Sequence, residues 1–289
     1  MKTIFLKYKS RLLLFGLILF LFPRCTENPF FNENIDITNQ LTVEGRVILN
    51  DDFVPVNIYV WLERFNLSTY TDSSGYFKLE LPDPHLQPGG GMNGVYSIYY
   101  YVANYRVKTS SMLLLKGQIE YGSGDVDNRG RINQTVILQK LIDIKTEITP
   151  SEIAFDNKDP LDIMITLDNK IDSVRVATYK RLNGQTSCII IKPRGAGIDS
   201  AFILQGIGTY LQDEWISNKT VWLMRYLFSV GFFPPGEYEF IPYIIIYQDN
   251  LPQELLDSID EELLFLSYRY LNLPIKQQTG CITVKKNGE

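Results

Sequence analysis

The chain has 289 residues, of which 45% are hydrophobic, and it carries a formal net charge of −5. This length allows two domains of ordinary size with buried cores. The 18 tyrosines and 16 phenylalanines favour pleated, half-buried surfaces over helices. Residues 1–24 hold five basic residues and no acid, so the remainder has 28 − 5 = 23 basic against 33 acidic residues, a net charge of about −10. An acidic body of this kind argues against phosphate backbones as ligands, and we expect no nucleic-acid partner.

The first 24 residues have the pattern of a secretory signal. A basic segment precedes an unbroken apolar run at 12–22, which is shorter than a membrane-spanning helix requires. Cys25 follows in LFPRC, and the segment resembles a bacterial lipoprotein signal, which implies a lipidated Cys25 as the mature N-terminus. Arg24 departs from that pattern, since a small residue usually precedes the cysteine.

Three interpretations of this segment stay open: a lipidated Cys25, an uncleaved anchor or atypical secretion, and a chance cysteine. The first two take the chain out of the cytoplasm. We therefore expect a cell-envelope protein, either lipid-anchored at the outer membrane or periplasmic and surface-exposed. Residues 25–40 are polar and aperiodic, and they are typical of a tether.

From residue 41 the pattern has a period of two. Apolar and polar residues alternate in LTVEGRVIL at 41–49, in VNIYVWLE at 56–63 and in YFKLEL at 76–81. This alternation predicts antiparallel strands with one face on a core. Between the last two, Asp72-Ser-Ser-Gly75 has the residues of a type I turn followed by a left-handed glycine.

The order GRV, a polar turn, PVNIYVWL and then TDSSGYFKLELP resembles the carboxypeptidase regulatory-like domain, a transthyretin-like (prealbumin-like) β-sandwich. The resemblance runs from Thr42 to Pro82 and continues toward Lys140. It implies an accessory module that acts as a rigid spacer or interaction domain. It does not imply peptidase chemistry, because the His-x-x-Glu zinc ligands of the peptidase domain do not occur in this sequence.

The second half, 143–289, repeats strand-length runs separated by turn signals such as Asn183-Gly184. We expect an all-β chain of two β-sandwiches: a carboxypeptidase regulatory-like one at 41–142 and a loosely Ig-like one at 143–289. One segment differs, because leucines recur at helical spacing after Pro252. This spacing predicts an amphipathic helix over 252–270, which either plugs one end of the sandwich or docks a partner.

Few residue patterns point to chemistry. His85 is the single histidine and lies in a Pro/Gly-rich loop, which argues against triad and His-rich metal chemistry, so we expect neither an enzyme nor a cofactor. Asp125 and Asp127 stand in a D-x-D-x-x-G order that is a weak calcium-loop signal. Arg129 occupies a ligand position there, and the alternative is a plain turn.

Two further sets of residues have a structural and a functional interpretation. Cys188 and Cys281 either pair in a disulfide or remain buried free thiols. Trp61, Tyr99 and Tyr101 either form a platform for glycan or peptide or pack within the sheets.

These expectations combine into a non-enzymatic bacterial cell-envelope (lipo)protein that acts as a structural, adhesion or interaction module. The alternative is a carbohydrate- or peptide-binding accessory subunit of an envelope transporter or hydrolase. The expected partners are the membrane, through a lipid anchor, and a protein or a glycan.

Overall fold

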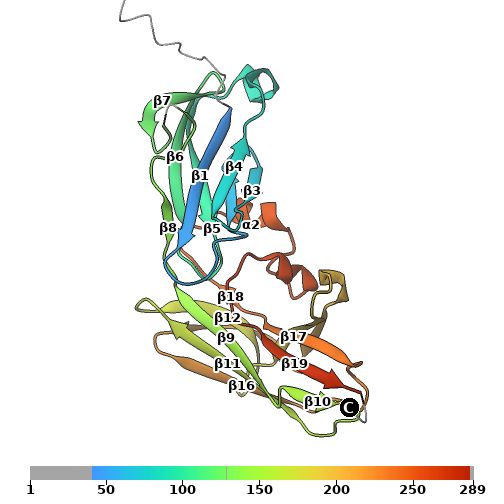
Figure 1. Ribbon diagram of the computed structural model, residues 1–289. Coiled ribbons are helices and arrows are strands. Elements are labelled where there is room, and N and C mark those ends of the chain that lie inside the picture. Colours follow the sequence, from blue (N-terminus) through green and yellow to red (C-terminus); the bar gives the residue numbers. More distant parts are fainter. Residues whose placement is uncertain (1–40, 128, 287–289) are drawn as a thin grey trace, which may run out of the picture. The chain divides into compact units, whose positions relative to one another are not determined.

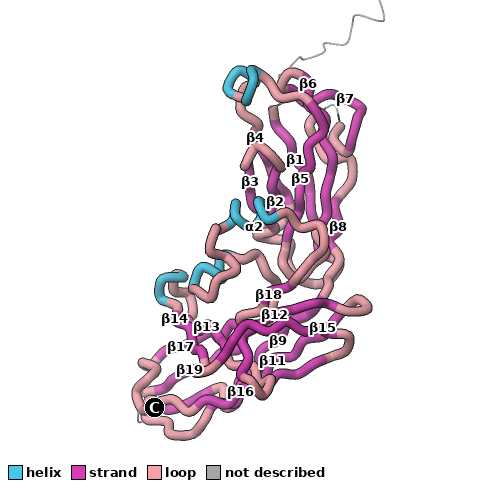
Figure 2. The backbone as a smooth tube through the Cα atoms, turned by 180° about the vertical axis from the view of Figure 1, so that it is seen from behind, coloured by secondary structure: helices cyan, strands magenta, loops and turns pink. Residues whose placement is uncertain are grey.

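The computed structural model of the protein describes residues 41–127 and 129–286 (Figures 1 and 2). The described residues are mainly β-strands, with one short α-helix and four short 3-10 helices, and they confirm the expected all-β class. The signal segment 1–24, Cys25 and the tether 25–40 lie outside the described residues. Within the described part of the chain, no helix is long and apolar enough to cross a membrane.

The first sandwich consists of two sheets. One has the strand order β4-β1-β8, and the other has the order β3-β2-β5-β6-β7. Two 3-10 helices, η1 (Pro84–Leu86) and η2 (Pro88–Gly90), follow β4. The strands are β1 (Thr42–Leu49), β2 (Tyr59–Leu62), β3 (Leu67–Tyr70), β4 (Tyr76–Glu80), β5 (Gly94–Tyr101), β6 (Lys108–Leu115), β7 (Gln118–Gly124) and β8 (Val136–Leu138).

Strands β1 and β4 fold as their alternation predicts. Val43 and Val47 of β1 and Phe77 and Leu79 of β4 are buried in one core, while Arg46 and Lys78 are exposed. The turn before β4 also has the expected chemistry, since Asp72 Oδ1 accepts hydrogen bonds from the backbone NH groups of Ser74 and Tyr76. Every buried member of this core lies between residues 43 and 138.

The second sandwich contains three short sheets around a separate core, whose buried members lie between residues 141 and 284. The sheet orders are β16-β11-β9, β15-β12-β18 and β10-β19-β17-β13-β14. The 3-10 helix η3 (Ile198–Ser200) precedes β14. The strands are β9 (Ile142–Thr149), β10 (Glu152–Ala154), β11 (Leu161–Asn169), β12 (Val174–Arg181), β13 (Cys188–Pro193), β14 (Phe202–Gln205), β15 (Thr209–Ile216), β16 (Thr220–Tyr226), β17 (Gly236–Pro242), β18 (Ile245–Ile246) and β19 (Gly280–Lys285).

The helix predicted over 252–270 is much shorter in the structure. Helix α2 spans Gln253–Ile259, and a 3-10 helix, η4, spans Tyr268–Asn272. The helix ends because Asp260 adopts an extended backbone with φ −166°. Its carboxylate then accepts hydrogen bonds from the Glu262 amide and the Asn272 side chain. Side-chain hydrogen bonding of this kind competes with continued helix, so the leucine spacing alone overestimates its length.

Candidate interaction groove

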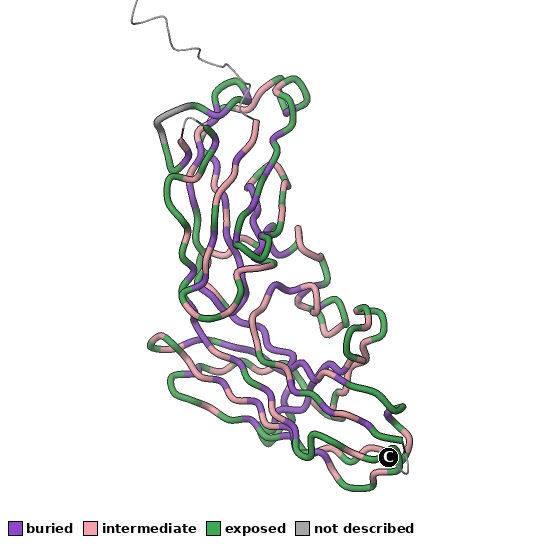
Figure 3. The backbone as a smooth tube through the Cα atoms, viewed as in Figure 1, coloured by how far each residue is buried: buried purple, intermediate pink, exposed green. Residues whose placement is uncertain are grey.

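The two sandwiches share a third buried cluster, which we call the junction cluster. Strands β2 and β5 of the first sandwich contribute rings to it, and strands β13, β17 and β18 and helix α2 of the second contribute aliphatic and aromatic side chains. Figure 3 shows buried backbone continuing along these strands. Its members include Tyr59, Trp61, Tyr101, Ala103, Ala177, Cys188, Ile190, Ile241, Tyr243, Ile245, Leu255, Leu256, Leu263, Tyr270 and Leu273.

The junction cluster supports the second interpretation of Trp61, Tyr99 and Tyr101, packing within the sheets, over a glycan or peptide platform. Trp61 is 4% exposed and Tyr101 is 2% exposed, and Tyr99 is half-buried with its ring centroid 5.5 Å from that of Trp61. The outer face of β2 and β5 is covered by the second sandwich, so all four residues of β2 are buried. These rings therefore pack in the protein interior and present no row to a ligand.

Two amide side chains make several of the hydrogen bonds between the sandwiches. Asn104, which is fully buried, donates to the carbonyls of Ile142 (3.1 Å) and Lys276 (2.7 Å) and accepts from the Lys276 amide (3.0 Å). Gln248 donates to the carbonyls of Ala103 (3.0 Å) and Tyr105 (2.8 Å). A network whose members are all satisfied fixes the relative position of the strands that it joins.

The two cysteines do not pair. Cys188 is buried in the junction cluster, Cys281 is exposed, and both are free thiols. Strand β17 lies between β13 and β19 in the sheet. Two strand spacings amount to about 10 Å, which exceeds the roughly 7 Å that a disulfide tolerates between Cα atoms. Burial raises the pKa of Cys188 to about 12, so this thiol behaves as a small apolar side chain.

The acidic residues of the weak calcium signal hold a turn. Asp125 Oδ2 accepts from the backbone NH and the hydroxyl of Ser111 at 2.7 and 3.1 Å. Asp127 Oδ1 accepts from the amides of Arg129 (2.7 Å) and Arg131 (2.9 Å). The two carboxylates serve different segments, and this is the turn that the sequence offers as the alternative. His85 is exposed in the short helix η1.

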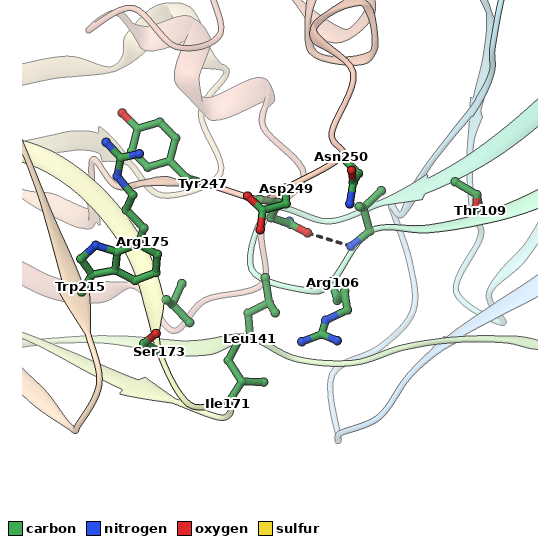
Figure 4. A pocket seen from close by; sticks show the side chains of 13 residues that line it. Arg106, Thr109, Leu141, Ile171, Ser173, Arg175, Trp215, Tyr247, Asp249 and Asn250 are labelled. Atoms are coloured by element: carbon green, nitrogen blue, oxygen red, sulfur yellow. Dashed lines mark hydrogen bonds between the residues drawn. The ribbon is translucent and has the colours of Figure 1, made fainter.

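A surface groove of about 800 Å³ lies where the two sandwiches meet (Figure 4). We call it the junction groove. Arg106, Val107 and Thr109 of the first sandwich form one side. The other side consists of residues of the second sandwich, and the hydrogen bond from the Val107 amide to Gln248 Oε1 (2.8 Å) joins the two sides. The second-sandwich lining comprises Leu141, Ile171, Ser173, Val174, Arg175, Trp215, Tyr247, Gln248, Asp249 and Asn250.

One wall of the groove carries a cation and two aromatic side chains. Arg175 on β12 lies opposite Trp215 on β15 in the strand register. Its guanidinium is 2.6 Å from the Asp213 carboxylate and 4.7 Å from the centroid of the Tyr247 ring. The ion pair and the cation–π contact fix Arg175, and Figure 4 shows its guanidinium beside the Tyr247 ring. Trp215 remains 66% exposed and Tyr247 remains 41% exposed.

Two other charged side chains of the groove lining, one from each sandwich, are not neutralised by neighbours within the described residues. Arg106 and Asp249 are both exposed, and within the described residues neither side chain has a hydrogen bond or an ion pair. Thr109, Ser173 and Asn250 add a hydroxyl or an amide to the lining. Leu141, which is buried, and the half-buried Ile171 contribute apolar side chains beneath these polar groups. The groove can therefore offer a flat ring, an apolar base and both donors and acceptors to one ligand.

The sequence interpretation did not find these groove residues. Trp215 and Arg175 lie on adjacent strands, but Arg106 is far from both in sequence, and the tertiary fold brings them together. The available signal was the charged and aromatic strand TYLQDEWI at β15, whose alternation is weak because several of its residues are exposed on both faces.

Comparisons with known proteins add little to this description. No family model matches the chain, and no curated protein matches it. A solved structure of the Bacillus anthracis TIE protein aligns with 86% of this chain and 32% of its own at 10% identity, with a TM-score of 0.21. This chain thus spans about a third of that protein.

Two further solved structures align with the present chain. The D00-D0 domain of Intimin covers 66% of this chain and 78% of its own at 11% identity, with a TM-score of 0.15. The Yersinia pseudotuberculosis adhesin InvE covers 73% and 60% at 8% identity, also with a TM-score of 0.15. Similarity this low carries no argument about function.

Proposed function

We propose that the chain is a non-enzymatic cell-envelope protein that acts as an interaction module and binds its ligand, a glycan or a peptide, in the junction groove. The observation that carries the proposal is Trp215, a large ring that is 66% exposed in a groove built by both sandwiches. An exposed ring among convergent polar groups is typical of binding sites, which are concave and mostly preformed.

The junction supports this proposal because it gives the groove a fixed shape. The junction cluster and the hydrogen bonds of Asn104 and Gln248 hold the two walls together, so little ordering is needed when a ligand binds. In this proposal the first sandwich is the carboxypeptidase regulatory-like module, and its role is to supply Arg106, Val107 and Thr109 at the groove.

The binding proposal is tested with arrays of glycans and peptides. The full chain is compared with Trp215→Ala and with Tyr210→Ala, a matched control on the same strand that is 45% exposed and does not line the groove. We expect signals that Trp215→Ala removes and Tyr210→Ala retains. If no array signal depends on Trp215, the groove is not a binding site.

The envelope proposal has an independent test. Cys25→Ser should abolish palmitate labelling of the chain and move it from the membrane fraction to the soluble fraction. Cys281→Ser is the matched control, since Cys281 is the exposed cysteine of the described residues. Labelling that survives in Cys25→Ser would rule out lipidation at this position.

A further inference from the structure

We infer that the ligand of the junction groove is an uncharged saccharide, an inference that rests on the proposed binding function and narrows it to one class. Three observations in the groove support it: the exposed ring of Trp215, the mixture of donors and acceptors, and the balance of charge.

The ring of Trp215 has the character of a stacking surface. It projects from β15 into the groove, and two-thirds of its surface is open to solvent. The other two tryptophans, Trp61 and Trp222, are 4% and 7% exposed, so burial is the normal state of this side chain in the protein. A pyranose ring presents a flat face of CH groups, and such a face covers an indole without losing the sugar's hydroxyl hydrogen bonds.

The polar groups opposite the ring suit hydroxyls. A sugar hydroxyl both donates and accepts, so a row of hydroxyls needs both kinds of partner. Arg106 supplies only donors, Asp249 supplies only acceptors, and Asn250 supplies both. None of these three side chains makes a hydrogen bond within the described residues, so a ligand can use them without breaking existing bonds.

The charge balance argues against a charged ligand. Arg175 is neutralised by Asp213 on the neighbouring strand. Of the remaining lining residues, Arg106 carries one positive charge and Asp249 carries one negative charge. An anionic sugar would be attracted by one and repelled by the other, and the same holds for a cation. The groove therefore favours neither anions nor cations, and its chemistry fits an uncharged saccharide with several hydroxyl groups.

A peptide fits the groove less well. Extended peptides usually bind by adding a strand to a free sheet edge. Strand β12, which carries Arg175 in the groove wall, pairs with β15 on one side and with β18 on the other. Strand β12 therefore has no free edge, and a peptide could add a strand to this sheet only at β15, the edge strand that carries Trp215, or at the two-residue strand β18; the peptides in the experiment test this mode. The volume of about 800 Å³ also lies within the range of about 300–1,000 Å³ that is typical of small-ligand sites.

The experiment uses Trp215 as its own probe. Because Trp61 and Trp222 are buried, acrylamide should quench mainly the fluorescence of Trp215 in the full chain, and Trp215→Phe should remove most of this quenching. The probes are the uncharged glycans that the array selects, their uronic-acid counterparts, and the best peptides. A bound saccharide should protect Trp215 from acrylamide, with a Kd that changes less than about twofold between low and high salt, because no ion pair is involved.

Two variants then separate the classes. Trp215→Ala should weaken binding of the uncharged glycan at least about tenfold, as expected for loss of a stacking ring. The double variant Arg106→Gln with Asp249→Asn removes both charges but keeps a donor at position 106 and an acceptor at position 249, so it should weaken binding of the uncharged glycan less than Trp215→Ala does. Tyr210→Ala remains the matched control.

The outcomes are distinguishable. Binding of the uronic-acid glycan alone, with strong salt dependence and loss in Arg106→Gln, overturns the uncharged class and leaves the binding function intact. Trp215-dependent binding of peptides alone overturns the saccharide class in the same way. If neither glycan nor peptide protects Trp215 from acrylamide, both the inference and the proposed function fail.

Discussion

Asn104 joins the two sandwiches through a fully buried side chain. Its side chain is fully buried and makes three hydrogen bonds to the second sandwich, two to Lys276 and one to the carbonyl of Ile142. Asn104→Leu keeps the size of the side chain and leaves two carbonyls and one amide without partners. Each buried unsatisfied group costs roughly 1–3 kcal/mol, and with partial relaxation we expect a total loss of about 3–5 kcal/mol in unfolding free energy.

The assay is urea denaturation followed by circular dichroism and by tryptophan fluorescence. The matched control is Asn218→Leu, the same substitution at an exposed residue of the turn between β15 and β16, where the side chain makes no hydrogen bond within the described residues. A surface change of this kind should stay within about 0.5 kcal/mol of the wild type. If the two variants have the same denaturation midpoint, Asn104 does not hold the junction.

Three further predictions follow from single sites. Iodoacetamide at pH 8 should alkylate the exposed Cys281 in the folded protein and should modify Cys188, whose pKa burial raises to about 12, only after denaturation; equal modification rates would contradict the structure. Gly75→Ala should lower the melting temperature strongly, because φ is +79° and the new Cβ would lie 2.0 Å from the Val47 carbonyl oxygen, whereas Gly184→Ala, with φ +80° and open space around it, should cost less. Burial raises the pKa of Asp143, but hydrogen bonds from Lys140 and Lys170 outweigh it, and the net pKa is lowered. A carboxyl with a lowered pKa stabilises the fold above its unfolded pKa of about 4 and loses this effect as the pH falls through its folded pKa, so the stability difference between wild type and Asp143→Asn should shrink below about pH 4; a constant difference would contradict this assignment.

The strands of the first sandwich could be predicted from sequence because one face of each packs on a single core, which leaves an alternation of apolar and polar residues. In β1 and β4 the alternate residues Val43, Val47, Leu49, Phe77 and Leu79 face that core, while Arg46, Tyr76, Lys78 and Glu80 are exposed. Strand β2 shows the limit of this reasoning. Its alternation suggested that Trp61 lies on a wet face, but that face is covered by a second sandwich from more than a hundred residues away. Local periodicity reports which residues alternate and cannot report what covers each face.

The helix and the groove were misjudged or missed for related reasons. Leucines at helical spacing continue past Ile259, but Asp260 ends the helix by bonding to Glu262 and Asn272, and no spacing rule contains that competition. The groove needs Arg106 beside the pair Arg175 and Trp215, a neighbourhood created only by the junction. The sequence therefore predicted that both walls of the groove belong to β-structure, but it did not predict which residues line the groove.

Because of the junction, neither sandwich can be separated from the other without exposing buried surface. The first sandwich alone would expose Tyr59, Trp61 and Tyr101, three large rings on one sheet face. An apolar patch of this kind on a free surface favours association, so the first sandwich produced as a separate module would be less soluble. The same cut would remove Arg106 and Thr109 from Trp215 and leave a single wall. The covering of the aromatic face and the formation of the groove are thus one structural event, and a ligand in the groove would stabilise the docking of the sandwiches as it binds, because only the docked state contains its site.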